Sequence, residues 1–315
     1  LHNDERKKNK KLLRMRVRKG VPNTFRGAVW TMSAGVPGKV FKTQVGKYKG
    51  LVLSTEVPNQ DTMDTIDRDI HRTFPRHMMF IEEAMRAKEA EAKDEELAAQ
   101  GIEAATSEED DFVNAKGGQA SLRRVLRAYS LYDTDVGYCQ GMNFIAATFI
   151  TFMPEEEAFW MLVSVMNEKP CLMRGLFGKR MSQTQEILFV AEKLVAQFFP
   201  RLYQHFENES IHITMFATQW LLTVYTSSFP FDLVTRVWDC FISEGWKIVY
   251  RVMLALLKIS TPVLMKCRFE DMLGHLTAIP ATVDGDAVMK VAFKIPLRKR
   301  HVRKYQREWQ SRDAD

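Results

Sequence analysis

The sequence lacks a hydrophobic run long enough to cross a bilayer. Its longest uncharged apolar stretch, Met142 to Met153, is far shorter than the roughly 20 residues that a spanning helix needs. The stretch from Ile248 to Met265 is longer, but two charged residues interrupt it, which is typical of a buried helix. The chain opens with charged residues rather than an apolar segment, so we expect no signal peptide.

Cysteine is scarce, and its spacing offers no C-x-x-C pair for a metal or a redox motif. The four residues lie far apart in apolar surroundings, at Cys139, Cys171, Cys240 and Cys267. We therefore expect buried, reduced thiols, no metal site and a cytoplasmic protein.

Alternating strand patterns with hairpin turns are nearly absent. The one candidate, GKYKGLVLST from Gly46, is short and isolated. Instead, apolar residues recur three and four apart, as in SLRRVLRAYSLYD and FDLVTRVWDCFISEG. The chain has 315 residues, of which 46% are hydrophobic and 27% charged, so it can bury a large core. We predict an all-α fold of many helices.

The net charge of +6 is unevenly distributed. The segments Arg6 to Lys19 and Lys294 to Arg307 are densely basic, whereas Glu89 to Asp111 is acidic. Basic ends favour an anionic lipid, nucleic acid or an acidic partner, although the simpler interpretation is a solvated helix face. Residues 87–118 are rich in Glu, Ala and Asp and have Phe112 as their single aromatic residue, which predicts a mobile insertion.

The stretch TIDRDIHRTFPRH, Thr65 to His77, predicts a helix that ends before Pro75. Ile66 and Ile70 share one face, and Arg72 falls on the opposite, solvent face. Asp69, three residues before Arg72, projects near it and is placed to pair with its guanidinium group. Considered alone, Arg72 is an ordinary solvated arginine.

The stretch DVGYCQGMNF, Asp135 to Phe144, precedes a strongly apolar helix. Gly137 and Gly141 permit sharp turns on either side of Tyr138 and Gln140. Gln140 is expected at a helix N-terminus, where its amide points outward. Considered alone, it is a turn or capping residue.

Together these stretches resemble the two signature motifs of the TBC domain, the Rab-type GTPase-activating module. IDRDIHR fits I-x-x-D-x-x-R, and YCQG fits Y-x-Q-G. Upstream, RKGVPNTFRGAVW resembles the family's opening pattern, and downstream SSFPFDLVTRVWDCFISEG resembles its late signature. All four occur in the family's order, over roughly Arg18 to Met272.

The resemblance implies a two-lobed, multi-helix TBC fold. It divides the chain into a basic helical lead at 1–17, a TBC domain at 18–275 that contains the insertion 87–118, and a basic helical tail at 276–315 that packs on the domain. It also implies structural roles, holding the lobes together, for five residues: Arg26, Trp30, Arg236, Trp238 and Asp239.

The mechanism that the resemblance implies is catalysis by two fingers supplied in trans. Arg72 matches the arginine finger and Gln140 the glutamine finger. Asp69 would orient Arg72, while Tyr138 and Gly141 would shape the glutamine loop. The protein would then be a GTPase activator in vesicle trafficking and not itself a hydrolase.

The implied partner is a Rab-family small GTPase in its GTP-bound form. The chain would have no cofactor of its own and would act on GTP and Mg²⁺ bound to the partner. We expect a cytoplasmic protein with peripheral endomembrane association through its basic ends, and no nucleic-acid partner. The alternatives are a catalytically silent TBC module that serves as a GTPase-binding scaffold, and a basic helical protein that binds through charge alone. Retention of both Arg72 and Gln140 favours the active interpretation over the silent one.

Overall fold

The computed structural model describes residues 2–36, 38, 44–81, 112, 115–178 and 182–312. Throughout these ranges the regular structure is helical and no strand occurs, so the predicted all-α class is confirmed. The single strand candidate, at Gly46, forms the short helix α4 instead. The predicted acidic insertion 87–118 lies outside the described residues, apart from 112 and 115–118. No described helix is both long and apolar enough to span a membrane.

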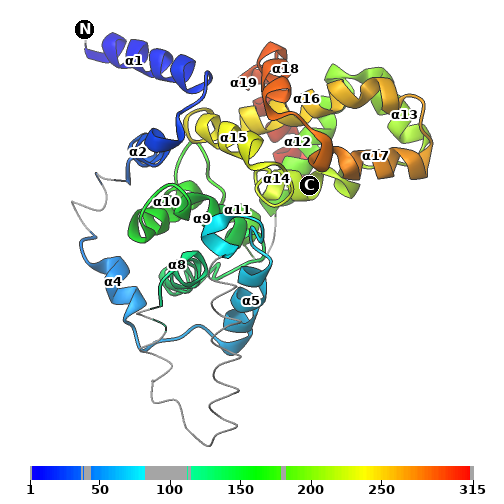
Figure 1. The fold of residues 1–315 in the computed structure, drawn as a ribbon. Helices are drawn as coiled ribbons and strands as arrows, with labels where there is room; N and C mark the ends of the chain where they lie inside the picture. Colours follow the sequence, from blue (N-terminus) through cyan, green and yellow to red (C-terminus); the bar gives the residue numbers. More distant parts are fainter. Residues whose placement is uncertain are drawn as a thin grey trace, which may run out of the picture. The chain divides into compact units, whose positions relative to one another are not determined.

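The chain forms two compact units: unit 1 comprises residues 1–34 and 165–315, and unit 2 comprises residues 35–164. Unit 2 contains α4 (Lys47–Val52), α5 (Gln60–His71), α8 (Gly118–Tyr132), α9 (Met142–Ile150) and the first part of α10 (Glu155–Asn167). In this unit α8 packs against α4, α5 and α9 (Figure 1). Asn59 caps the N-terminus of α5, and its side chain accepts a hydrogen bond from the amide of Thr62.

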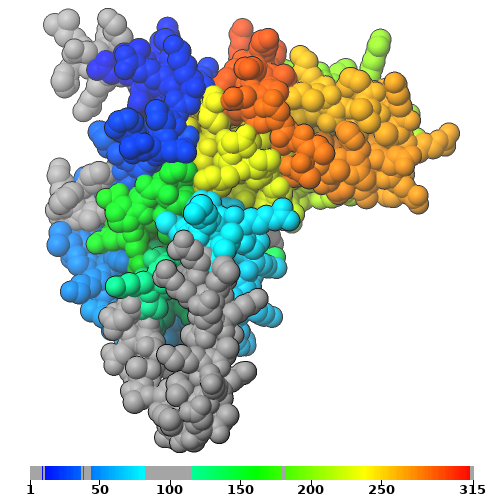
Figure 2. Space-filling model, in the orientation of Figure 1, coloured from blue at the N-terminus to red at the C-terminus, as the bar shows by residue number. Residues whose placement is uncertain are grey.

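Unit 1 combines the N-terminal helices with the second half of the chain. Its elements are α1 (His2–Val17), α2 (Asn23–Ala34), α11 (Arg174–Phe177), α12 (Ser182–Phe198), α13 (Pro200–Asn208), η1 (Ile213–Met215), α14 (Ala217–Leu222), α15 (Phe231–Glu244), α16 (Trp246–Leu264), α17 (Phe269–Thr282), α18 (Gly285–Lys294) and α19 (Lys299–Arg312). The helix α18 packs on α15 and α16, and α19 packs on α12. Figure 2 shows the yellow surface of α15 beside the orange surface of the C-terminal helices.

The five residues with expected structural roles all lie in unit 1, where four of them meet between α2 and α15. The buried carboxylate of Asp239 accepts hydrogen bonds from Arg26 Nε at 3.0 Å and Trp30 Nε1 at 2.8 Å. The Trp30 ring lies 6.5 Å from that of Trp238, between ring centroids. Arg236, on the same helix, instead contacts Asp286 at 2.8 Å. These contacts fasten α2 to α15 inside unit 1.

The expectation of four buried thiols is correct for two of them. All four cysteines are free, and Cys171 and Cys240 are buried. Cys139 and Cys267 are partly exposed. Cys139 lies in the Tyr138–Gly141 turn, outside the helices whose apolar pattern suggested burial.

Candidate functional site

Arg72 ends α5 with its side chain half exposed. Ile66 and Ile70 on the opposite face are 0% and 1% exposed, as the helical period predicts. The helix stops at His71, and Arg72 is its C-terminal capping residue. The helix has therefore ended before Pro75, as predicted. Phe74 adopts a positive φ of 44°, whereas a residue that precedes proline ordinarily takes an extended conformation.

Asp69, which the sequence predicts to lie near Arg72, is buried. One carboxylate oxygen lies 2.5 Å from Arg72 Nη2, and the other accepts a hydrogen bond of 2.5 Å from the Tyr138 hydroxyl. The phenol ring of Tyr138 comes from a loop that covers this side of α5, which the sequence pattern of α5 alone does not reveal. Burial, together with the bond to Asp69, raises the pKa of Tyr138 well above its ordinary value, so the phenol remains a donor.

Gln140 lies in the same loop as Tyr138 and is exposed. Gly137 and Gly141 have φ values of 65° and 103°, which confirms that the turns on both sides use glycine's left-handed region. Gly141 caps α9, and its amide donates to the side chain of Asn143 at 3.0 Å. The loop therefore presents Gln140 just ahead of the first turn of α9.

Asn143 and Thr73, neither of which is a predicted site residue, connect the two finger segments. Asn143 is fully buried, and its Nδ2 donates to the Thr73 hydroxyl at 2.7 Å. That hydroxyl in turn donates to the carbonyl of Asp69 at 2.6 Å. The amide side chain of Asn143 in the mostly apolar run MNFIAATFI was the available signal, because a buried amide needs partners.

Aromatic packing fixes the turn after Arg72 to α9. The Phe74 ring lies 5.9 Å from that of Phe144 and 6.1 Å from that of Phe80. Such edge and tilted contacts add to the apolar area that these rings bury. The turn carrying Arg72 and the loop carrying Gln140 therefore rest on one helix.

The structure thus assembles all five predicted site residues of unit 2 around one buried network. Asp69 and Tyr138 lie inside it, Gly141 forms its turn, and Arg72 and Gln140 extend from it toward solvent. An exposed guanidinium group on a buried carboxylate offers an oriented, permanent positive charge with several donors. An exposed primary amide nearby can both donate and accept. Together, the guanidinium group and the amide suit a reaction in which water attacks an anion.

The sequence profile of the Rab-GTPase-TBC domain family matches residues 87–265, which is more than half of the chain. The chain belongs to this family. The matched range includes Tyr138 to Gly141 and the late signature around Asp239, and it begins after Arg72.

Individual relatives extend the likeness over nearly the whole chain. The human "Ecotropic viral integration site 5 protein homolog" is 33% identical over 97% of this chain. The "Rab GTPase-activating protein tbc-11" of Caenorhabditis elegans is 31% identical over 92% of it. The chain spans only 33% and 28% of the lengths of these two proteins. The crystal structure of a flagellar RabGAP TBC domain from Chlamydomonas is 29% identical, with a TM-score of 0.68, and covers 90% of this chain and 84% of its own.

Proposed function

We propose that the chain accelerates GTP hydrolysis by a Rab-family GTPase, with Arg72 and Gln140 entering the partner's nucleotide site. One observation carries the proposal: two exposed side chains with the right chemistry extend from a single buried hydrogen-bond network. Membership of the Rab-GTPase-TBC domain family supplies the class of partner.

In the proposed mechanism, Arg72 stabilises the charge that spreads over the γ-phosphate oxygens as the bond to the β-phosphate weakens. An arginine delivered in this way is worth about 10³–10⁵ in rate for GTPases. Asp69 holds the guanidinium group in one direction, so little rotamer freedom is lost on docking. Arg72 thereby contributes transition-state stabilisation rather than a nucleophile.

Gln140 positions the attacking water in this proposal. Its amide oxygen accepts a hydrogen bond from the water while its NH₂ group donates to the phosphate. GTP and Mg²⁺ belong to the partner, which must be in its GTP-bound form, and the chain contributes no cofactor. It is an activator in this scheme and performs no hydrolysis by itself.

Single-turnover GTP hydrolysis by a panel of Rab proteins tests the proposal. We expect acceleration by the parent chain and a loss of about 10³-fold with Arg72→Lys, which keeps the charge but loses the planar fork. Arg72→Ala should lose as much, with some loss of stability because buried Asp69 loses its cation. Arg68→Ala is the matched control, since Arg68 is exposed on the same helix and, among the described residues, its hydrogen bonds go to Asp64 and Thr65 of that helix. No acceleration of any Rab protein would refute the proposal.

Gln140→Ala tests the second finger separately. We expect it to slow hydrolysis of bound GTP more than it weakens association with the Rab protein. Thr134→Ala, at another exposed position of the same loop, should leave both quantities unchanged. Unchanged hydrolysis by Gln140→Ala would remove this residue from the mechanism. Tight binding of Rab–GTP without acceleration by the parent chain would instead establish the alternative, a silent scaffold.

We also propose a cytoplasmic protein that associates peripherally with endomembranes through its basic ends. The last turn of α1 carries Arg14 and Arg16, and α19 is basic along its length. Clustered cations near an anionic leaflet each add about 1 kcal/mol of attraction. Sedimentation with anionic vesicles, weakened by salt, is the expected result, and sedimentation equal to that with neutral vesicles would contradict it.

A further inference from the structure

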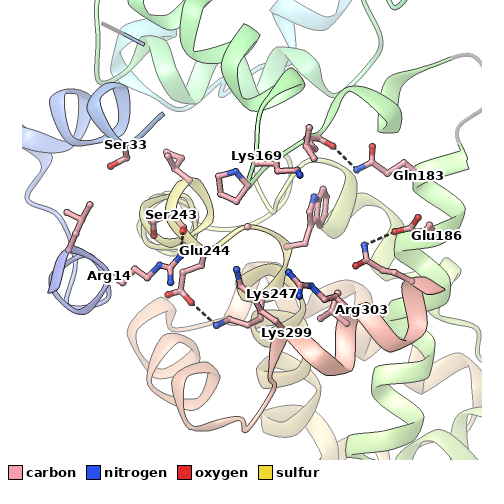
Figure 3. A pocket seen from close by; sticks show the side chains of 18 residues that line it. Arg14, Ser33, Lys169, Gln183, Glu186, Ser243, Glu244, Lys247, Lys299 and Arg303 are labelled. Carbon is pink, nitrogen blue, oxygen red and sulfur yellow. Dashed lines mark hydrogen bonds and ion pairs between the residues drawn. The ribbon is translucent and has the colours of Figure 1, made fainter. Parts of the chain in front are cut away.

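Unit 1 contains a cavity of about 750 Å³ lined by side chains from both basic ends of the chain (Figure 3). Five cationic side chains line it, from α1, the segment after α10, α16 and α19. They are Arg14, Lys169, Lys247, Lys299 and Arg303. The volume is that of a small-molecule site. The two basic segments, far apart in sequence, therefore contribute to one concave site.

The two carboxylates of the cavity are already engaged. Glu244 contacts Arg18 at 2.5 Å and Lys247 at 3.1 Å. Glu186 accepts a hydrogen bond of 2.7 Å from the side chain of Gln306. Both acidic groups thus have partners of their own, and neither forms an ion pair with the remaining four cations in the part of the chain that the structure describes.

Three other cations of the cavity act on Lys299. Burial lowers the pKa of Lys299 from its ordinary value. The positive charges of Arg14, Lys247 and Arg303 lower it further. The Nε of Arg14 is buried and has no hydrogen-bond partner among the described residues. Unpaired positive charges that repel one another in a cavity constitute a site for an anion.

Gly245 and Trp246, which line the cavity, are held in place by their neighbours. The α15–α16 turn at Gly245 has a φ of 71°, and a Cβ there would lie 2.6 Å from the carbonyl oxygen of Pro170. Trp246 donates its indole N–H to the carbonyl of Cys171 at 2.7 Å, so its ring is held in place. A ligand would therefore meet a fixed wall at these two residues and the charged side chains that also line the cavity.

We propose that this cavity binds a compact anion carrying several phosphate groups, such as a phosphoinositide headgroup or a soluble inositol polyphosphate. The cations come from four separate segments around a large cavity, so one phosphate group could engage only some of them. Arginine and lysine both form charge-assisted hydrogen bonds with phosphate oxygens. The lipid form of this ligand deepens the proposed membrane association by giving it a site and a headgroup class.

Isothermal titration with inositol hexakisphosphate and with inorganic phosphate tests the site directly. We expect the first to bind at a single site and the second to bind far more weakly. The variant Lys299→Ala/Arg303→Ala should raise the Kd for the hexakisphosphate about tenfold or more, because two charge-assisted contacts are lost. The matched control is Arg300→Ala/Lys304→Ala, which removes the same charges from the same helix outside the cavity. Equal losses in both variants, or equal affinity for inorganic phosphate, would overturn the proposal.

Vesicle binding distinguishes a lipid headgroup from a soluble inositol polyphosphate. One set of vesicles contains phosphatidylcholine with phosphatidylinositol bisphosphate, and the other contains phosphatidylcholine with phosphatidylserine. If the chain binds the bisphosphate vesicles and Lys299→Ala/Arg303→Ala abolishes this binding, the ligand is a lipid headgroup. If the chain binds the hexakisphosphate but not the vesicles, the ligand is a soluble inositol polyphosphate. Both results support the site. Vesicle binding that depends on any anionic lipid and survives the double variant would retain the proposed membrane association and overturn the cavity as its cause.

The site is also separable from the proposed hydrolysis chemistry, whose residues lie in unit 2. Lys299→Ala/Arg303→Ala should stimulate a soluble Rab protein as well as the parent chain does. Conversely, Arg72→Ala should bind the hexakisphosphate with unchanged affinity. Each proposal can therefore fail while the other stands.

Discussion

At the scale of single residues, Asn143 has the contacts that most directly connect the two proposed fingers. Its amide bridges the Thr73 hydroxyl on one side and the Gly141 backbone amide on the other. Because both groups are buried, Asn143→Ala would leave them without these partners, at a cost of about 1–3 kcal/mol. We expect the variant to remain folded and to lose Rab stimulation through a lower rate of hydrolysis, with little change in Rab affinity.

Thr148→Val is the matched control for this prediction. Thr148 is equally buried on the same helix, but its hydroxyl donates at 2.7 Å to the carbonyl of Phe144 in that helix. Thermal denaturation should show a loss of stability in both variants, whereas single-turnover hydrolysis should fall only for Asn143→Ala. Parallel losses of hydrolysis in the two variants would mean that Asn143 acts only through stability.

The sequence predicted the outer residues of this site better than its interior. The exposure of Arg72 follows from the helical spacing of the buried residues Ile66 and Ile70. The turns at Gly137 and Gly141 follow from the ease with which glycine adopts a positive φ. The burial of Asp69 does not, since it depends on Tyr138 arriving from a loop 69 residues away. Helical periodicity reports on one element at a time and cannot identify what covers it.

At the scale of elements, two carboxylates each tie several helices together. Glu155 of α10 accepts hydrogen bonds from Arg124 of α8 at 2.9 and 2.7 Å and from the hydroxyl of Tyr48 in α4. Burial by itself raises the pKa of Glu155, but the bonds from Arg124 and Tyr48 outweigh it and lower the pKa below 4.5. Glu244 of α15 is lowered in the same way by Arg18 and Lys247, again against burial.

These lowered pKa values predict how stability depends on pH. A carboxyl group whose pKa is lower in the folded state stabilises the fold above its unfolded pKa, and that contribution disappears as the pH falls through the folded value. We therefore expect the free energy of unfolding to decrease below about pH 4.5, the ordinary pKa of both groups. Urea denaturation should show a shallower pH dependence in Glu155→Gln than in the parent. Glu156→Gln, at the exposed next position, should keep the parent's slope, and an unchanged slope in Glu155→Gln would contradict the prediction.

Helix boundaries were predictable where capping chemistry marks them. The boundary between α17 and α18 is one such place, because α17 ends at Thr282 and the side chain of Asp284 caps α18. Pro280 does not end α17, which continues through it for two residues. The strand-like pattern after Gly46 failed because so short a run has too few residues to distinguish one period from another.

At the scale of the whole molecule, unit 1 is discontinuous, since residues 1–34 join residues 165–315. The pairing between α2 and α15 that closes it links Arg26 to Asp239, which are 213 residues apart. No local pattern predicts such a contact, although the family's opening and late signatures contain both residues. The same closure brings the two basic ends of the chain into the cavity of unit 1.

Breaking one buried ion pair in each unit should reveal how independently the two units are stabilised. Asp239→Ala leaves the guanidinium group of Arg26, which is 4% exposed, without its carboxylate, and such a loss costs about 3–5 kcal/mol. Arg124→Ala makes the corresponding change in unit 2 by removing the cation that pairs with Glu155. Hydrogen exchange followed by mass spectrometry reports the loss of protection segment by segment.

We expect Asp239→Ala to lower protection in α2 and α15 and to leave α5, α8 and α9 protected, because its lost contacts lie wholly within unit 1. Arg124→Ala should lower protection in α8 and α10, whose ion pair it removes, and leave α2 and α15 unchanged. Stimulation of a Rab protein should then survive Asp239→Ala at temperatures where unit 2 remains protected. Equal loss of protection across both units in either variant would show that they unfold together, and the proposed fingers would then depend on Asp239 as much as on their own network.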